Sequence, residues 1–402
     1  MKILQVCNKF PYPPKDGGAI AKFNLLKGLS SLGHDLTVLA MNTNKHYFDV
    51  KNMPPAVKNL AVFVDVYTNT RLAPLKALGN LLFSALPYNA VRFITPGFKR
   101  KLIETLQQDQ FDVVQLEGLY LCPYIKDIRA NSKALVAYRA HNIEHEIWQR
   151  VCQHEPNVLK KAYLKILARR IEQFEKSFVN QYDLLVPITK RDAASMKKMG
   201  CTKPVHICPT GTYGIAQPAS TAKPQPASFF HLGGLDWPPN QAGLLWFVEK
   251  IWPHVLAQLP MANFFIAGRN APNSFVKAIA NKKGVCYVGE VEDAHLFMAG
   301  MAVMVVPLLS GSGMRIKIVE GMANGKAIVS TSIGAEGIDA TNNKEIVIAD
   351  TESDFISSMV KLGNSPNMVE DLGKKAREYV LQNFDNSKIS SSLATFYKQH
   401  LQ

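Results

Sequence analysis

The sequence lacks the hydrophobic run of roughly 18 residues that a membrane-spanning helix needs. It also has few cysteines, at positions 7, 122, 152, 201, 208 and 286, and no Cys-x-x-Cys pair. This scatter argues against a disulfide framework and against a zinc cluster, so we expect buried, reduced thiols. The first ten residues, MKILQVCNKF, are typical of a first strand rather than of a signal peptide. These features predict a cytoplasmic protein.

Acidic residues are scarce in the first half of the chain. Residues 1–220 hold 30 Lys and Arg against 16 Asp and Glu, whereas residues 221–402 hold 16 of each, so the whole net charge of +14 falls on the first half. Such a charge favours an anionic partner, such as an acidic membrane surface, a lipid diphosphate or a nucleic acid. We expect one of the first two and no nucleic acid. A basic surface that serves only solubility is the alternative.

Repeats and low-complexity tracts are also absent, and 402 residues are too many for one hydrophobic core, which predicts two domains. Short apolar runs alternate with helical segments along the whole chain. Continuously apolar strands separated by helices indicate parallel sheets covered on both faces, and thus an α/β fold with two doubly wound, Rossmann-like domains. The strands are expected at residues 2–8, 36–41, 61–67, 112–118, 134–140, 183–189, 228–234, 263–269, 285–291, 302–309, 327–333 and 345–350.

The domain boundary is expected in residues 208–228, where Pro, Ala, Ser and Gly replace the apolar periodicity. A first domain would then cover residues 1–207 and a second domain residues 229–385. Because ligands of open parallel sheets bind at the carboxyl ends of the strands, we expect a site in a cleft between the domains. The last segment, 386–402, has an apolar helical stripe that fits a place on either domain; the stripe consists of Ile389, Leu393 and Phe396.

Two strand ends of the first half carry candidate site residues. Gly17 and Gly18 open a helix after the first strand, and such a helix N-terminus suits a phosphate, although a plain turn has the same pattern. His141 follows an apolar strand and is expected to form hydrogen bonds at the rim of the cleft, with a solvated turn as the alternative. Metal binding by His141 and His145 needs a helix across both residues, which the strand end argues against.

Residues 72–102 combine leucines and phenylalanines with Lys76, Arg92 and three consecutive basic residues at 99–101. A segment of this kind can lie on an anionic membrane surface, where apolar burial and attraction to acidic headgroups act together. The alternative is a helix packed on the first domain beside a solvated basic turn. The sequence favours the two equally.

Residues 310–324 place a glycine-rich loop, two cations and a carboxylate directly after an apolar strand. On a helical wheel of about 100° per residue that starts at Gly313, three polar side chains share one face: Lys317, Glu320 and Asn324. Arg315 lies in the first turn, which Ser310 or Ser312 would cap.

This arrangement predicts a site for a phosphate with a polar tail. The phosphate would bind the loop amides of Gly311, Ser312 and Gly313 together with Arg315 and Lys317. The carboxylate of Glu320, one turn further on, would accept hydrogen bonds from hydroxyls such as those of a ribose. The alternative is a surface ion pair between Lys317 and Glu320, three residues apart on the helix.

Several of these segments resemble the family 4 glycosyltransferases of GT-B fold, and the resemblance covers essentially the full chain. It is carried, in order, by KDGGAIAKFNLLKGLSSLGHDLTVLA, PTGTYGI, WPPNQAGLLWFVEKIWP, FFIAGR, YVGEV, VVPLLSGSGMRIKIVEGMANGKAIVSTSIGAEGI and the terminal helix. It implies transfer of a sugar from a nucleotide diphosphate donor with retention of configuration, and neither a metal nor another cofactor. It also implies that the donor binds mainly the C-terminal domain and the acceptor the N-terminal domain, to which residues 386–402 would return.

The resemblance also assigns residues. It places Glu320 at the nucleotide ribose, Gly17 and Gly18 near the donor phosphates, and His141 near the reacting sugar.

Two features of the family are missing from the sequence. The first of the family's two glutamates falls at Ser312, and a basic pair on the first helix of the second domain falls at Gly234 and Pro239. We predict that Arg315 and Lys317 replace this pair and stabilise the diphosphate as it leaves.

The expected function is therefore transfer of a hexose-type sugar from a nucleotide diphosphate to a glycan or lipid-linked acceptor, in cell-surface polysaccharide assembly. The enzyme is expected in the cytoplasm, including the inner face of the membrane. A non-catalytic nucleotide-sugar-binding protein of the same fold and a sugar-nucleotide epimerase are the alternatives. A nicotinamide oxidoreductase is disfavoured because no Gly-x-Gly-x-x-Gly follows the first strand.

Overall fold

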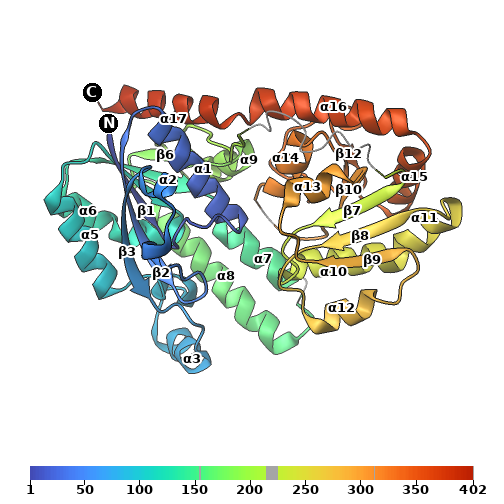
Figure 1. The fold of residues 1–402 in the computed structure, drawn as a ribbon. Helices are drawn as coiled ribbons and strands as arrows, with labels where there is room; N and C mark the ends of the chain where they lie inside the picture. The colour runs from blue at the N-terminus through green and yellow to red at the C-terminus, as the bar shows by residue number, and fades with distance from the viewer. Residues whose placement is uncertain (154, 214–224, 312, 402) are drawn as a thin grey trace. The chain divides into compact units, whose positions relative to one another are not determined.

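The computed structural model describes residues 1–153, 155–213, 225–311 and 313–401, which divide into two compact α/β units (Figure 1). Unit 1 comprises Met1–Gly211 and Asn386–Gln402, and unit 2 comprises Thr212–Asp385. The linker expected at residues 208–228 is too long at both ends. The amide of Cys208 donates to the carbonyl of Pro187 within unit 1 (2.8 Å), and Ser228 already begins a strand of unit 2. Within that expected linker, residues 214–224 lie outside the described residues.

Unit 1 is built on a parallel six-stranded sheet with the order β3-β2-β1-β4-β5-β6. The order of connections reverses between β1 and β4, and ligands of such sheets bind beside this point at the carboxyl ends of the strands. Every strand overlaps a predicted apolar run. The strands are β1 (Lys2–Cys7), β2 (Asp35–Thr43), β3 (Val62–Thr68), β4 (Val113–Glu117), β5 (Leu135–Ala140) and β6 (Leu184–Pro187).

Hydrophobic cores cover both faces of this sheet because successive side chains of a strand point in opposite directions. In β1, Leu4 and Val6 belong to one core, whereas Ile3 and Cys7 belong to the other. The helices of unit 1 are α1 (Gly17–Ser31), α2 (Pro55–Lys58), α3 (Pro74–Phe83), α4 (Tyr88–Val91), α5 (Pro96–Gln108), α6 (Ile125–Asn131), α7 (Glu144–Gln153), α8 (Val158–Phe178), α9 (Lys190–Lys198), α17 (Asn386–His400) and the 3-10 turns η1 (Val50–Asn52) and η2 (Leu119–Tyr124).

The terminal helix α17 packs against α1 in unit 1 (Figure 1). Its predicted apolar stripe is buried, with Leu393 fully covered. Gly28 of α1 allows the close approach, because a Cβ there would overlap the side chain of Ser390. The side-chain amide of Asn386 fixes the start of the helix by donating to the carbonyl of Asn24 (2.7 Å).

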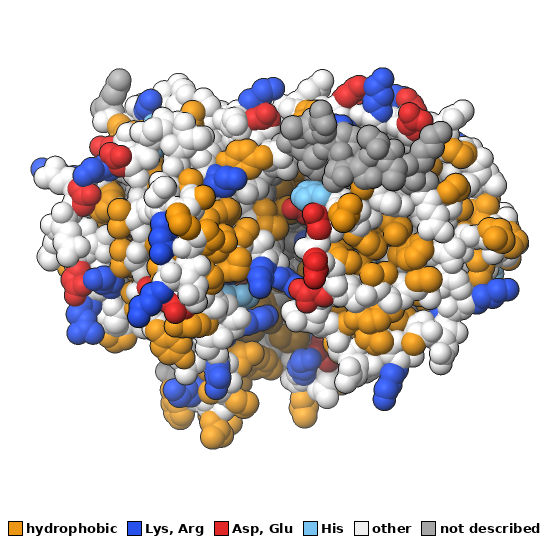
Figure 2. Space-filling view, viewed as in Figure 1, with side chains coloured by type: hydrophobic (Ala, Val, Ile, Leu, Met, Phe, Trp, Pro, Cys, Tyr) orange, Lys and Arg blue, Asp and Glu red, His pale blue; other side chains and the backbone are white. Residues whose placement is uncertain are grey.

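The segment 72–102 divides into a buried and an exposed part. Helix α5 buries Phe98 and Leu102 in the core of unit 1, as the packed alternative predicts. Helix α3, in contrast, has no buried residue although its sequence, PLKALGNLLF, is mostly apolar. Figure 2 shows these hydrophobic side chains gathered at the lower end of the view, where Figure 1 places α3.

Unit 2 has a second parallel six-stranded sheet with the order β12-β11-β10-β7-β8-β9, which reverses between β7 and β10. Its strands also overlap the predicted runs: β7 (Ser228–Leu232), β8 (Asn263–Ala267), β9 (Val285–Gly289), β10 (Val303–Val306), β11 (Ala327–Ser330) and β12 (Val347–Ile348). The helices are α10 (Pro238–Trp246), a π-helical segment η3 (Phe247–Ile251), α11 (Trp252–Gln258), α12 (Asn273–Ile279), α13 (Ala294–Ala299), α14 (Ile316–Ala323), α15 (Glu352–Gly363) and α16 (Pro366–Asn383).

Two further expectations concern the cysteines and the membrane. All six cysteines are free thiols; four are buried as expected, but Cys152 and Cys286 are only half-buried. Among the helices of the described ranges, none combines the length and the hydrophobicity needed to cross a membrane.

Candidate functional site

Helix α14, which follows β10, begins later than the helical wheel assumed. Its first residue is Ile316 and its N-cap is Arg315, so the predicted helix start at Gly313 and the predicted cap by Ser310 are wrong. The cause lies in the loop, where Gly311 (φ 124°) and Gly313 (φ 80°) adopt left-handed backbone conformations that a helix cannot include. The second candidate cap and loop residue, Ser312, lies outside the described residues.

Arg315 lies at the turn between β7 and α10. Its guanidinium carbon is 5.0 Å from the ring centroid of Trp237, a cation–π contact with the N-cap residue of α10. Only a glycine fits at position 311, because a Cβ there would overlap both the Arg315 guanidinium and the Trp237 ring. The glycine-rich loop thus holds Arg315 beside the turn.

Lys317 reaches the same turn from the first turn of α14. Its ammonium donates to Oδ1 of Asn240 (3.0 Å) and to Nε2 of His231 (3.2 Å). His231 is an acceptor there because its Nδ1 lies 2.9 Å from the carbonyl of Val305, to which it donates, and because burial keeps its pKa well below the usual range. These contacts exclude the surface ion pair with Glu320 as the role of Lys317.

The turn also contains the positions at which the basic pair of the family is missing. Gly234 lies in the loop after β7, while Pro238 and Pro239 open α10 and supply no amide hydrogen. A Cβ at Gly233 would lie 3.3 Å from Nζ of Lys317. Arg315 and Lys317, at the start of α14, therefore supply positive charge at a turn where α10 has no cation and where its first two residues have no amide hydrogen.

Burial and the neighbouring Arg315 hold the pKa of Lys317 well below its usual range. The hydrogen-bond partners of its ammonium, Asn240 and His231, are neutral, so they accept hydrogen bonds without balancing its charge. An anion bound at this place would be attracted by both cations and would raise the pKa of Lys317 again. The site is thus electrostatically suited to a phosphate.

Glu320 follows one turn further along α14. Burial raises the pKa of its carboxyl group, an effect that nearby His295 of α13 partly offsets. Within the described ranges, the carboxylate forms no hydrogen bond or ion pair, whereas the backbone carbonyl of Glu320 accepts from the side-chain amide of Asn324 (2.7 Å). The carboxylate is therefore available to hydroxyl groups of a ligand, at a distance of one helical turn from the two cations.

In unit 1, α1 begins at Gly17, as predicted, with Asp16 as its N-cap. The Asp16 carboxylate accepts from the amide of Ala19 (3.0 Å) and pairs with Lys9. Neither glycine has a positive φ, but a Cβ at Gly18 would lie 3.3 Å from Nζ of Lys9. Burial, together with the charge of Lys22, lowers the pKa of Lys9 to about 8. Lys9 follows β1 at the expected phosphate site and was not predicted from the sequence.

His141 follows β5 and is held by a carboxylate that the sequence analysis also missed. Its Nε2 lies 2.6 Å from Oε2 of Glu117, the last residue of β4, which is fully buried. The other donors to this carboxylate are the amides of Gln5 (2.7 Å) and Gln115 (2.5 Å) and the guanidinium of Arg139 (3.4 Å). Gln115 and Glu117 are polar residues in an otherwise apolar strand, and this was the signal available in the sequence.

The protonation states of this pair follow from its surroundings. Burial alone would raise the pKa of Glu117, but Arg139 and His141 outweigh it and hold the pKa well below the usual range. Burial lowers the pKa of His141 to about 4, although its bond to Glu117 opposes this shift. At neutral pH, His141 is therefore neutral with its proton on Nε2, and its Nδ1 is left as a hydrogen-bond acceptor.

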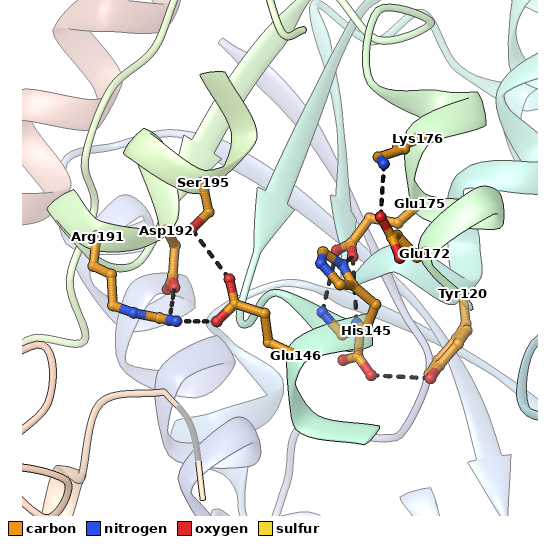
Figure 3. Close-up of polar contacts among 10 residues, drawn as sticks. Tyr120, His145, Glu146, Glu172, Glu175, Lys176, Arg191, Asp192 and Ser195 are labelled. Atoms are coloured by element: carbon orange, nitrogen blue, oxygen red, sulfur yellow. Dashed lines mark hydrogen bonds and ion pairs between the residues drawn. The ribbon is translucent and has the colours of Figure 1, made fainter. Parts of the chain in front are cut away.

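His145 points to a different carboxylate and begins a separate cluster on α7 (Figure 3). Its Nδ1 lies 2.6 Å from Oε2 of Glu175, and Glu175 also accepts from the amides of Glu144 (3.2 Å) and His145 (3.4 Å). Glu175 of α8 thus caps the N-terminus of α7. Because His141 precedes this helix and binds Glu117, the two histidines do not form an i, i+4 pair.

A hollow of about 520 Å³ lies between α7 and α9, which we call the α7–α9 hollow. Among its lining residues, Figure 3 shows Arg191 and Ser195 directed at the carboxylate of Glu146, to which Ser195 donates (3.2 Å). Three cations against one carboxylate make the lining basic, which suits an anionic group. The hollow is lined by His145, Glu146, Gln149, Arg150, Gln153, Arg191, Ala194, Ser195 and Lys198.

Known families and proteins resemble both units. Residues 16–212 match the family described as Glycosyltransferase Family 4, and residues 226–365 match the family described as Glycosyl transferases group 1. An uncharacterised 44.6 kDa protein in the cps region of Klebsiella pneumoniae is 25% identical over 404 residues, which cover 98% of each chain.

Solved structures share the two-sheet GT-B fold. Sucrose-phosphate synthase from Thermosynechococcus elongatus has a TM-score of 0.74 and 14% identity, with 99% of each chain covered. Anabaena HepE in complex with UDP has a TM-score of 0.68 and 12% identity, over 99% of this chain and 100% of HepE. TarM has a TM-score of 0.72 and 12% identity, with 98% of each chain covered.

Proposed function

The chain belongs to the family 4 glycosyltransferases, and from this premise we propose that it transfers a hexose-type sugar from a nucleoside diphosphate to a glycan or lipid-linked acceptor, with retention of configuration. The Klebsiella relative in a cps region supports a role in cell-surface polysaccharide assembly. The HepE structures with UDP and UDP-glucose support a nucleotide-sugar donor. The protein would work in the cytoplasm, at the inner face of the membrane, with no nucleic acid as a partner.

The observation that carries the proposal is the joint position of Arg315 and Lys317 at the β7–α10 turn. The diphosphate would bind between this turn and the loop around Gly311 and Gly313. One helical turn away, Glu320 would accept hydrogen bonds from two ribose hydroxyls. In this arrangement the two cations do the work of the basic pair that is missing at positions 234 and 239.

The reaction would be a single displacement, in which the acceptor attacks the sugar on the same face from which the nucleoside diphosphate leaves. The bond between the anomeric carbon and the diphosphate oxygen breaks, and its electron pair leaves with the nucleoside diphosphate. The acceptor oxygen forms the new bond from the same face, and its proton passes to the departing phosphate oxygen. Arg315 and Lys317 would stabilise the negative charge that develops on the diphosphate, and we propose no metal or other cofactor.

His141 would act as a hydrogen-bond acceptor for the transferred sugar. Because Glu117 holds the proton on Nε2, the free Nδ1 of His141 accepts a bond from a sugar hydroxyl. The α1 N-terminus at Gly17 and Gly18, with Lys9 beside it, would add a positive field for the donor phosphates. On the acceptor side, the basic α7–α9 hollow would bind an anionic group of the acceptor.

A thermal-shift panel of nucleotide sugars tests this proposal. A bound donor should raise the melting temperature by mass action, and the same donor should release its nucleotide slowly in water and faster with acceptor. Stabilisation without any nucleotide release would instead favour the non-catalytic binding protein. Interconversion of the sugar without an acceptor would favour the epimerase, and a panel in which no nucleoside diphosphate stabilises the protein would exclude all three.

A further inference from the structure

Helix α3 exposes its apolar side instead of burying it. Leu75, Leu78 and Leu82 follow one another at spacings of three and four, so they form one stripe along the helix. Leu75 is 85% exposed, and Phe83 at the end of the helix is 88% exposed. Leu72, just before the helix, is exposed as well. We call these five side chains the α3 surface.

The orientation of α3 is fixed by bonds to the rest of unit 1. Arg170 of α8 donates to the carbonyls of Asn80 (3.2 Å) and Leu81 (2.8 Å) at the end of the helix. At its start, the hydroxyl of Tyr88 accepts from the amide of Ala73 (3.2 Å). The apolar stripe is therefore held outward by polar contacts on the other side. Such contiguous exposed apolar surface usually marks a binding surface.

The segment that contains α3 and the neighbouring start of α8 are rich in basic residues. Residues 66–103 contain six Lys and Arg and no Asp or Glu, and residues 156–171 of the neighbouring α8 segment contain five Lys and Arg and again no acid. Arg170 joins the two segments through its bonds to α3. Three of these cations pair with carboxylates outside the two segments: Lys99 with Asp127, Lys101 with Glu104 and Lys160 with Glu155. An excess of positive charge remains. Apolar side chains beside such an excess match an acidic bilayer, whose headgroups attract the cations while its acyl region receives the leucines.

The start of α8 repeats this combination. Val158 and Leu159 are 79% and 84% exposed, and Lys160 and Lys161 follow directly. In Figure 1, the first turn of α8 and helix α3 both lie at the lower end of unit 1, and Figure 2 shows hydrophobic and basic side chains there.

From these observations we propose that the α3 surface docks unit 1 onto a bilayer that contains anionic phospholipid. The leucines of α3 and Phe83 would enter the boundary between headgroups and acyl chains, and the surrounding Lys and Arg would bind lipid phosphates. A second copy of the chain fits less well, because a symmetric dimer through this surface would bring two arrays of like charge together. The inference rests on the membrane location proposed above and names the surface responsible for it.

Vesicle sedimentation with a charge-reversing variant tests the inference. The full chain should sediment with phosphatidylcholine vesicles that contain phosphatidylglycerol, less with phosphatidylcholine alone, and less in high salt. The double variant Leu75→Glu/Phe83→Glu should lose at least about tenfold in partition coefficient, since each change removes one inserted side chain and adds a repelled charge. The matched control is Met261→Glu in unit 2, which is 86% exposed and should sediment like the parent protein.

The vesicle experiment can fail or succeed independently of the test of the proposed function. Both variants change exposed side chains, so their melting temperature and their stabilisation by the donor should equal those of the parent. Equal sedimentation of the α3 variant and the parent would overturn the inference, as would a concentration-dependent dimer that the α3 variant abolishes. Normal vesicle binding by a protein that no nucleoside diphosphate stabilises would instead reject the proposed function and keep the docking surface.

Discussion

Nε2 of His141 lies 2.6 Å from Oε2 of Glu117, a carboxylate that is itself fully buried at the end of β4. The pair fixes which nitrogen of the imidazole carries the proton, and thus which nitrogen faces a ligand. Glu117 is a positioning residue in this scheme, because it acts through His141.

Glu117→Gln should therefore reduce kcat by about 10- to 100-fold, the equivalent of one buried hydrogen bond, with little change in the donor KM. Nitrogen NMR of labelled histidine should show the proton of His141 shared between both ring nitrogens. The matched control is Glu175→Gln, which makes the same change beside His145. If both variants lose activity only in proportion to their lost stability, the positioning role is wrong.

Lys317→Met should weaken binding of a nucleoside diphosphate by about 10- to 100-fold, because it removes one charged hydrogen-bond donor. The control is Lys326→Met in the same unit, since Lys326 binds the backbone carbonyls of Ala299 (3.2 Å) and Met301 (2.9 Å). Calorimetry measures both affinities directly. Equal losses in the two variants would contradict a phosphate-binding role.

Proton uptake provides a second test of Lys317. Since burial and Arg315 lower its pKa in the unbound protein, a bound diphosphate should raise that pKa, and affinity should fall as pH rises through the unbound value. Calorimetry at about pH 8, above the titration of the phosphate itself, should detect uptake when buffers of different ionisation enthalpy are compared. The uptake should disappear in Lys317→Met.

Glu320→Ala should abolish discrimination between a nucleoside diphosphate and its 2′,3′-dideoxy analogue. In the parent protein, the two ribose hydroxyls should improve affinity by about 10-fold or more because each donates to a carboxylate. The variant should bind both ligands with similar affinity. A preference for the ribose that survives the substitution would place the ribose elsewhere.

The raised pKa of Glu144 predicts that the stability of the protein depends on pH. Burial and the charge of Glu175 raise its pKa from 4.5 to about 7, so the folded protein binds this proton more tightly than the unfolded chain. This contribution is fully present below pH 4.5 and is lost as pH rises to about 7, which lowers the free energy of unfolding by about 1–3 kcal/mol. Glu144→Gln should remove this decline in urea unfolding curves. Glu172→Gln should not, because Lys176 lowers the pKa of this half-buried carboxylate.

The sheets could be predicted from sequence because most residues of each strand are apolar, and this signal is local. The start of α14 could not, since the left-handed conformations of Gly311 and Gly313 leave no mark in a hydrophobic pattern.

Contacts between residues that are far apart in the sequence could not be predicted either. Glu117 is joined to Gln5 across 112 positions, and Lys317 to His231 across 86. No spacing within one segment encodes such pairs. For the same reason the sequence left α3 undecided: whether an apolar helix faces a core or the outside depends on which partners the rest of the fold brings to it.

The hydroxyl of Tyr397 in α17 donates to Oε1 of Gln115 (2.6 Å), whose amide in turn donates to Glu117. Gln115 leaves the ribosome 282 residues before Tyr397, so unit 1 must wait for all of unit 2 to be synthesised before this network can close. A nascent chain that has completed both sheets still lacks Tyr397, and thus the hydrogen bond to Gln115 that completes the network around Glu117 and His141. Catalytic competence would then be the last property that the growing polypeptide acquires, which keeps a half-made enzyme from consuming donor.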